Sequence, residues 1–415
     1  MWSDLDKFAP HTKKVFEAIG KAKIHPVLER IPNWLLDGKI NQTSKTWGSY
    51  LNRTSEYGVT NRERLLRYLI TRSVVDQGSD IQGVEEWHEG TFSALYAMGL
   101  PVLDDLTLLV KAYPTILEVA DQMRVKTIND RSAVWAAESE TRKEGAYWPF
   151  TVDGQRGKGN THWFLTARVF PTLLLAQVVQ GGLSELVFGN SSIESPKEMA
   201  RRLRNDSDYK RGLSWVMGDK ACDLFAKWAI GSYRLSEGMP CNWTPQDCPI
   251  PMDQRIGRLM IRCGFMDEFY GVAAEMSTKS HGWTPRDGQS RPASHGQKIP
   301  MGKWHLTVMD FRRQGRVAIP HRTLARDWVS ETSQEFGRKF AAANTGPQDI
   351  ISLLCLSYSE EFGVTLTPVE VDDYFMEVGG RECWDVGPKC GECPLSEHCQ
   401  ANNDASMIEL KNCFT

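Results

Sequence analysis

Four cysteines near the carboxyl end of the chain have the spacing of a metal-binding loop. They are Cys383, Cys390, Cys393 and Cys399, which follow the pattern C-x6-C-x2-C-x5-C. Thiolates this close in sequence can converge on one centre, and thiolate-only ligation suits an iron–sulfur cluster or zinc. A structural zinc site usually pairs two short C-x2–4-C knuckles. This loop instead has one knuckle between two longer arms, and an iron–sulfur cluster, zinc and a set of disulfides are the alternatives for it.

Two further residues at expected helix starts have side chains that could do chemistry. Lys220 follows the turn glycine Gly218, which opens a helix with an apolar face. Asp253 follows two prolines, Pro249 and Pro251, and is placed to cap the next helix. The positive end of a helix holds a carboxylate ionised and pushes a lysine towards the neutral, nucleophilic amine. A plain helix cap is the structural alternative for Asp253.

The cysteine loop resembles the 4Fe-4S loop of the endonuclease III group of helix-hairpin-helix DNA glycosylases. The run Lys389–Leu395 (KCGECPL) and the pair Gly380-Arg381 ahead of the first cysteine carry this resemblance. It implies that all four cysteines hold a 4Fe-4S cluster. The cluster would have a structural or electrostatic role, because no residue role in base removal requires iron.

Three other stretches are similar to motifs of the same family and occur in the family's order. Gln77 ends the first core helix in Gln-Gly-Ser-Asp, where the family's glutamine fills the gap left by an extruded base. Gly218 resembles the last hairpin glycine that offers a backbone amide to a DNA phosphate. Lys220 stands where bifunctional members have their lyase nucleophile. The hairpin departs from the family at Val216, which replaces a glycine and resists positive φ.

The last motif surrounds Asp253. Met252, Asp253, Ile256 and Arg258 match the family's pattern of an apolar residue, the catalytic aspartate, an aliphatic residue and an arginine. The resemblance therefore implies that Asp253 is catalytic. We expect Arg255 and Arg258 to contact DNA, together with Gln77 and Gly218.

The resemblance covers residues 61–100, 210–270 and 375–400, which is less than half of the chain. It implies an all-α, two-lobed helix-hairpin-helix glycosylase-like fold with large insertions and a carboxyl-terminal 4Fe-4S loop. From the amino end, we expect a helical extension, the first part of the core, an insertion, the hairpin and catalytic region, a second insertion with a basic and aromatic loop, and the last helices with the cluster loop. These segments are 1–60, 61–130, 131–205, 206–275, 276–350 and 351–415.

Apolar periodicity predicts several helices. Leu65, Leu66, Leu69, Ile70 and Val74 recur at helical spacing, Thr60 or Asn61 can cap the start of their helix, and it ends at Asp76-Gln77-Gly78. Further helices are expected over Val84–Met98, over Leu103–Val125 with a break near Pro114, over Leu324–Ala343 and over Gln348–Phe362. The stretches Asp153–Asn160 and Ser277–Lys303 are expected to be basic loops, and Pro368–Val378 leads into the cysteine loop.

Composition limits the class of protein. The chain has 415 residues, 41% hydrophobic content and a net charge of −3, so positive potential for DNA must be local. Ten cysteines are too few for a disulfide scaffold, and no Walker pattern occurs. No apolar run reaches membrane-spanning length, and the start Met1-Trp2-Ser3-Asp4 lacks the features of a signal peptide. We expect an intracellular monomer in a reducing compartment.

Three functions compete. The first is an enzyme that binds duplex DNA, extrudes a damaged or modified base and cleaves its N-glycosidic bond, with Lys-dependent lyase activity as an added step. The second resembles the bacteriophage branch of this fold that hypermodifies thymine, namely the α-glutamyl/putrescinyl thymine pyrophosphorylases or amino acid:DNA transferases. The insertions and the altered hairpin favour it, whereas Lys220 and Asp253 favour the first. The third is a DNA-binding iron–sulfur protein without catalysis.

Overall fold

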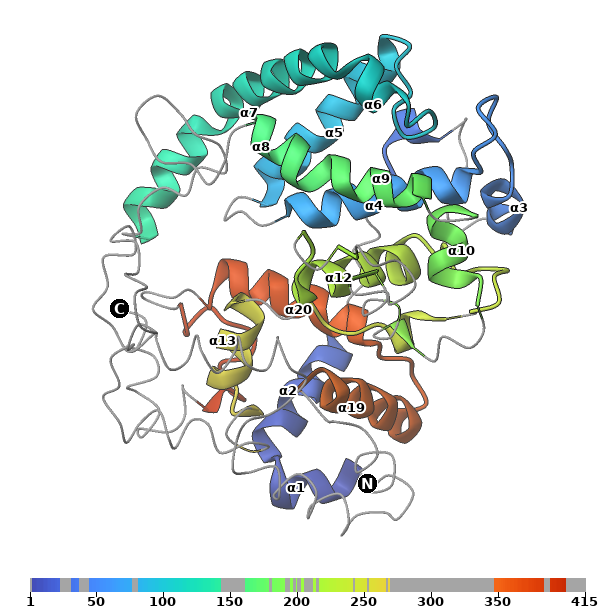
Figure 1. Cartoon of the computed structure of the whole chain (residues 1–415). Helices are drawn as coiled ribbons and strands as arrows, with labels where there is room; N and C mark the ends of the chain where they lie inside the picture. Colours follow the sequence, from blue (N-terminus) through green and yellow to red (C-terminus); the bar gives the residue numbers. More distant parts are fainter. Residues whose placement is uncertain are drawn as a thin grey trace, which may run out of the picture. The chain divides into compact units, whose positions relative to one another are not determined.

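The computed structural model describes most of the chain outside two long gaps. The described residues are 2–22, 31–36, 45–76, 81–142, 161–178, 181–190, 195–196, 199, 203–204, 212–213, 216–241, 243–251, 254–265, 268, 347–383 and 389–400. They fold into two compact units: unit 1 joins Met1–Val27 to Pro245–Thr415, and unit 2 is Leu28–Thr244. Both units are helical, with no strand among the described residues (Figure 1). The expected all-α class is therefore confirmed.

Unit 2 contains the larger set of described helices. Its α-helices are α3 (Trp47–Leu51), α4 (Asn61–Val75), α5 (Ile81–Ala97), α6 (Leu108–Lys111), α7 (Tyr113–Arg142), α8 (Thr161–Phe164), α9 (Phe170–Val178), α10 (Gly182–Phe188) and α12 (Asp219–Ala226). A 3-10 turn (Asn33–Leu35) and two π-helical segments (Leu165–Val169 and Lys227–Ser232) complete it.

Helix α4 is the central element of unit 2, because α3, α5, α9, α10 and α12 all pack against it (Figure 1). Thr60 caps its start by accepting a hydrogen bond from the Glu63 amide at 3.2 Å, which confirms the expected start. The expected apolar face is buried, but so is every other residue of the helix. Two ion pairs compensate its buried charges: Arg64 with Asp104 at 2.8 Å, and Arg67 with Glu63 at 2.9 Å.

Glu63 also ties α4 to α10. Its carboxylate accepts hydrogen bonds from the amides of Leu183 at 3.0 Å and Ser184 at 2.8 Å, at the start of α10. Gly182 permits this approach, because it has φ +78° and a Cβ there would lie 2.7 Å from the Glu63 carboxylate. One buried carboxylate therefore satisfies helix amides from a segment about 120 residues away.

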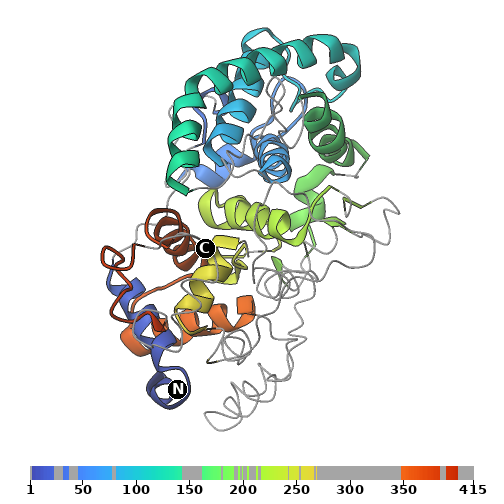
Figure 2. The same cartoon turned by 90° about the vertical axis from the view of Figure 1, so that its left-hand side faces the viewer.

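The helices that follow α4 agree with the sequence in kind and differ in extent. The helix expected over Val84–Met98 is α5, which begins three residues earlier. The helical stretch expected over Leu103–Val125 with a break near Pro114 corresponds to two helices, α6 and the 30-residue α7, which are interrupted at Ala112. Pro114 lies in the first turn of α7, where a missing amide costs no hydrogen bond. Helix α7 packs along α5 (Figure 2).

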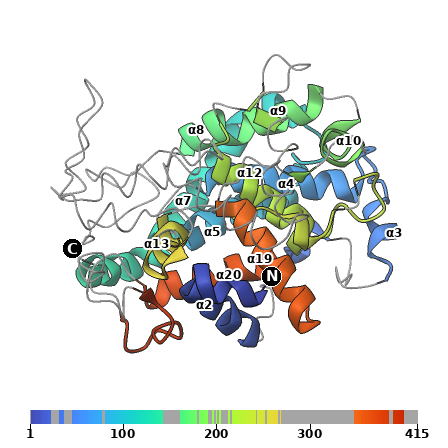
Figure 3. The same ribbon diagram turned by 90° about the horizontal axis from the view of Figure 1, so that it is seen from below.

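Unit 1 brings the two ends of the chain together. Its α-helices are α1 (Leu5–Phe8), α2 (Pro10–Lys21), α13 (Gln254–Arg262), α19 (Pro347–Phe362) and α20 (Pro368–Arg381), with 3-10 turns at Trp2–Asp4 and Pro245–Asp247. Helix α20 packs against α13 and α19, and α19 also packs against α2 (Figure 3). The expected helix over Gln348–Phe362 is confirmed by α19, and α20 occupies the stretch that was expected to lead into the cysteine loop. A capping box between Thr367 and Glu370 starts α20.

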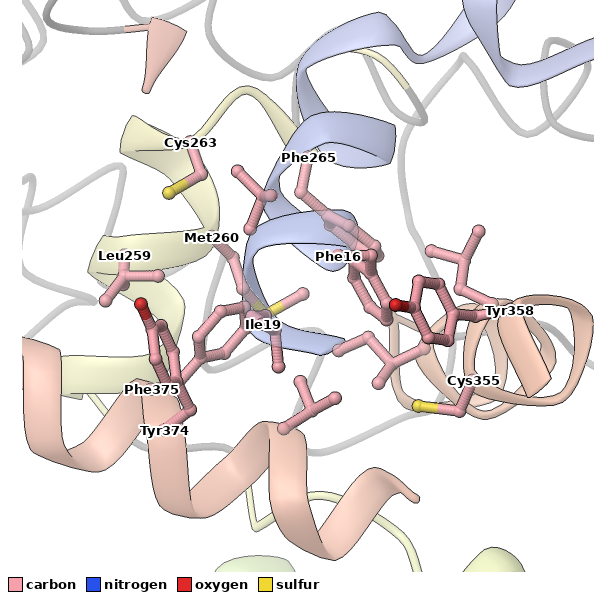
Figure 4. Close-up of a cluster of buried hydrophobic side chains, with 14 of the residues drawn as sticks. Phe16, Ile19, Leu259, Met260, Cys263, Phe265, Cys355, Tyr358, Tyr374 and Phe375 are labelled. Carbon is pink, nitrogen blue, oxygen red and sulfur yellow. The ribbon is translucent and has the colours of Figure 1, made fainter. Parts of the chain in front are cut away.

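The unit 1 core lies among these helices. Phe16 of α2, Met260 of α13, Tyr358 of α19 and Phe375 of α20 converge there, and Cys263 follows the end of α13 (Figure 4). Gly264 has φ +90°, and a Cβ on it would lie 2.8 Å from the Gln400 side chain. This glycine therefore ends α13 and lets the cysteine loop pack closely beside it.

Several expected features lie outside the described residues. They are the two basic loops, Asp153–Asn160 and Ser277–Lys303, and the helix expected over Leu324–Ala343. The expected six-segment division of the chain stays a prediction.

No single helix among the described ranges has the length and hydrophobicity to cross a bilayer; only the pair Thr161–Gln177 and Gly182–Phe188, bent by 84°, reaches that threshold jointly.

Candidate functional site

The four motif cysteines lie in unit 1, in the segment that follows α20. Cys383 comes two residues after the helix, and its amide donates to the Val378 carbonyl at 3.0 Å. Turn hydrogen bonds then fold the second part of the loop, from Cys393 to Cys390 at 3.3 Å and from Cys399 to Leu395 at 2.8 Å. All four cysteines are half-buried, and Leu395 anchors the loop in the unit 1 core with 1% of its surface exposed.

Three of these cysteines gather around a fifth one that the motif does not include. Cys383, Cys393 and Cys399 pack against the unit 1 core beside the buried Cys263. A hydrogen bond with Cys399, burial and the neighbouring Cys383 and Cys393 raise the pKa of Cys263 well above its usual value. Burial, with Cys383 and Cys399 nearby, raises the pKa of Cys393 to about 12. Without a cation to offset their charges, the Cys263 and Cys393 side chains remain protonated thiols.

Arg262 connects α13 to the same cysteines. It is 2% exposed, its Nη1 donates to Cys383 Sγ at 3.3 Å, and its carbonyl accepts from Cys399 Sγ at 3.1 Å. A guanidinium beside sulfur suits an anionic thiolate cluster. Arg262 is therefore placed to offset negative charge on a group bound by these thiolates. No three His, Cys, Asp or Glu side chains of the described ranges stand close enough to hold a metal ion, so the 4Fe-4S cluster stays a prediction.

Lys220 is the second residue of α12 in unit 2. The N-cap residue Gly218 is exposed and extended, with φ −81° and ψ 175°. The Lys220 side chain is 20% exposed, and its Nζ lies 3.7 Å from Oδ2 of Asp76, whose side chain is only 4% exposed. The expected apolar face of α12 is confirmed, since Ala221, Leu224 and Phe225 are buried. The structure therefore gives Lys220 a buried carboxylate partner.

Asp76 stands at the carboxyl end of α4, directly before Gln77. Its Oδ1 has no hydrogen-bond partner among the described residues. A second ion pair lies nearby, between Arg72 and Glu85 at 2.5 Å, and the Arg72 guanidinium stacks 4.5 Å over the ring of Trp228. Burial raises the pKa of Glu85, with Asp76 adding to the shift and Arg72 opposing it. Asp76 and Lys220 therefore belong to a connected group of charges where α4, α5 and α12 meet.

The hairpin before α12 differs from the phosphate-binding form that the resemblance implies. The amides of Val216 and Met217 both donate to the Leu213 carbonyl, at 2.8 Å and 2.7 Å. Arg168 Nη1 donates to the Val216 carbonyl at 2.6 Å. Val216 is buried, and its φ is not positive, because Arg234 is the only non-glycine residue with positive φ in the described ranges. These two hairpin amides are therefore already used within the protein.

The remaining predicted site residues are only partly described. Gln77 and Asp253 lie outside the described residues. Arg255 and Arg258 belong to α13, which begins one residue after Asp253, but their side chains lie outside the description. Lys220 belongs to unit 2, whereas the two arginines and the cysteine loop belong to unit 1.

Sequence reasoning missed three residues with a place in these sites: Asp76, Arg262 and Cys263. Asp76 directly precedes Gln77, at the end of the helix that the sequence predicts. Arg262 and Cys263 are adjacent at the end of α13 and lie more than a hundred residues before the cysteine loop, so no spacing rule connects them to it. The one feature of the sequence that could have pointed to this contact is Cys263 itself, a cysteine outside the loop.

Comparison with known proteins adds no relative: no protein-family model, no curated protein and no solved structure matches this chain.

Proposed function

We propose that this chain is an enzyme that acts on bases in duplex DNA. It would extrude a damaged or modified base and cleave its N-glycosidic bond, with Lys220 as the nucleophile of an accompanying lyase step. The observation that carries the proposal is the Lys220–Asp76 pair at the start of α12, in which an amine at a helix terminus has a carboxylate 3.7 Å away. A base beside the nucleophile is one of the arrangements that activate a side chain for covalent catalysis.

The other residues would have supporting roles. A base inside a duplex must be rotated out of the stack before C1′ can be reached, and Gln77 would fill the gap that the base leaves. Asp253 would stabilise the positive charge that develops on the sugar as the base departs. Cys383, Cys390, Cys393 and Cys399 would hold a 4Fe-4S cluster, which would supply structural rigidity and local charge. The Arg262 guanidinium beside Cys383 would offset part of the negative charge of that group.

The hairpin favours a second candidate, the bacteriophage thymine-hypermodification branch described above. Because the amides of Val216 and Met217 are bonded to Leu213, DNA would be held differently from the glycosylases that this chain resembles. In this alternative the protein would present an extruded thymine derivative, and the chemistry would take place at its 5-substituent.

One experiment separates the candidates. The purified protein is incubated with duplexes that carry a panel of modified pyrimidines and purines, and mass spectrometry then measures both released bases and digested nucleosides. Free base supports cleavage of the glycosidic bond. An altered nucleoside with no free base supports the hypermodification branch. Unchanged DNA that nevertheless binds the protein supports a binding function and contradicts both enzymatic candidates.

A further inference from the structure

Asp76 is an unusual buried carboxylate. Its side chain is 4% exposed, one oxygen lies 3.7 Å from the Lys220 ammonium, and the other has no hydrogen-bond partner among the described residues. An unmatched polar atom in a buried site costs free energy. The neighbouring Arg72–Glu85 pair is bonded at 2.5 Å and stacks on Trp228, as expected for a structural contact.

We propose that Asp76 is a positioning residue for Lys220, which holds the ammonium at the start of α12 and accepts its proton when the amine attacks. This inference rests on the proposed function. It also has a geometric basis, because the Lys220 ammonium lies 3.7 Å from a carboxylate whose side chain is only 4% exposed. Transfer of one proton from Lys220 to Asp76 gives a neutral amine and a neutral carboxylic acid.

The lyase step can be written on an abasic nucleotide, whose C1′ is an aldehyde. Asp76 takes one proton from the Lys220 ammonium, and the nitrogen lone pair forms the N–C1′ bond while the carbonyl electrons move to oxygen. In total, two protons move from the lysine nitrogen to the former carbonyl oxygen. Asp76 accepts the first of them and passes it on to that oxygen, and the second leaves the nitrogen after the N–C1′ bond has formed. The oxygen leaves as water, and the product is a protonated Schiff base. No oxidant or further reactant is needed.

The charged groups that face Asp76 limit how it can act. They are Arg72 on the same helix, Glu85 on α5 and Lys220 on α12. Arg72 is already paired with Glu85, and its guanidinium lies over Trp228. Lys220 is the group whose ammonium lies within ion-pair distance of Asp76.

The test is borohydride trapping of the protein on a duplex with one abasic site, measured as an initial rate from pH 6 to pH 9. The variants are Asp76→Asn, Asp76→Glu and the control Glu85→Gln, which removes a charge from the same group without touching Lys220. We expect Asp76→Asn to trap about a hundredfold more slowly at pH 7, in the range of general-base effects, and to recover as the pH rises. We expect Asp76→Glu to restore part of the rate, and Glu85→Gln to keep the wild-type pH profile.

Each contrary result has a distinct meaning. An equal loss in Asp76→Asn at every pH, in protein with unchanged circular dichroism, overturns proton acceptance and leaves a structural role. Faster trapping by Asp76→Asn at pH 7 also overturns it, because Asp76 would then only hold the ammonium protonated. If Asp76→Asn does not fold, the pH dependence of the trapping rate of Asp76→Glu decides. A rate that is lower than that of the wild type by the same factor at every pH overturns the inference. Absence of an adduct in the wild type at all pH values instead overturns the Lys220 step of the proposed function.

Discussion

His88 allows a pH-dependent contribution to stability to be predicted from the structure. It lies on α5 with 1% of its surface exposed, between the rings of Tyr68 and Phe92, whose centroids are 5.0 Å and 4.8 Å away. Its Nε2 lies 2.9 Å from the Thr71 hydroxyl, which donates to the Tyr68 carbonyl and must therefore accept from His88. Its Nδ1 has no hydrogen-bond partner among the described residues, so a second proton would be unmatched.

Burial, with the positive charge of Arg72 as a second cause, lowers the pKa of His88 well below its usual value. The folded protein therefore keeps His88 neutral, whereas the unfolded chain protonates it below a pH of about 6.5. Because the unfolded state then binds more protons, the free energy of unfolding falls as the pH falls below that value. One such group gives a slope of at most about 1.4 kcal/mol per pH unit, or about 1 kcal/mol between pH 6.5 and pH 5.5.

The assay is urea unfolding of the wild type and His88→Gln at pH 7.5, 6.5 and 5.5. The matched control is His162→Gln, which removes an exposed histidine from the same unit. We expect the wild type and the control to lose about 1 kcal/mol more than His88→Gln between pH 6.5 and pH 5.5. An identical pH dependence in the wild type and His88→Gln would refute the reasoning, whatever the absolute stability of the variant.

Three further predictions concern the two sites and the central helix. The purified protein should be brown, absorb broadly at roughly 400 nm and contain iron. Cys393→Ala should lose the colour, and the control Cys222→Ala should keep it. Stoichiometric zinc without iron or sulfide would contradict the cluster. Glu63→Gln should lower the free energy of unfolding by about 3 kcal/mol, because it breaks a buried ion pair as well as weakening the contact with α10; a loss below about 1 kcal/mol in urea unfolding would count against that role. Asp253→Asn should reduce base release about a hundredfold or more while DNA binding persists, since asparagine caps a helix about as well as aspartate; full activity would show that the catalytic aspartate is misassigned.

Helix α4 shows what could be predicted from sequence and what could not. The spacing of Leu65, Leu69 and Val74 predicted the helix, and the Thr60 cap predicted its start. Burial of its charged side chains could not be predicted, because their partners come from distant parts of the chain. Arg67 donates to the Leu103 carbonyl, and Arg62 donates to the Leu235 carbonyl. Apolar periodicity along the sequence predicts only the hydrophobic face of a helix. It does not reveal which charged side chains find a distant ion-pair or hydrogen-bond partner and become buried.

The candidate sites divide in the same way. Short-range spacing identified the cysteine loop and placed Lys220 at a helix start, since both depend on neighbours along the chain. The approach of Asp76 to Lys220 spans more than a hundred residues and depends on how α12 packs against α4. The approach of Cys263 to Cys399 likewise depends on how α13 and α20 pack in unit 1. Such contacts follow from tertiary structure and leave no local pattern.

Identification of the lysine that joins DNA tests the central claim most directly. The wild-type protein is trapped with borohydride on an abasic duplex, the adduct is digested, and the modified peptide is sequenced by mass spectrometry. The account predicts that the sugar remnant is carried by Lys220, and that Lys220→Gln gives no adduct. Attachment to another lysine, such as the buried Lys227 in the π-helical segment after α12, or an adduct that persists in Lys220→Gln, would contradict it.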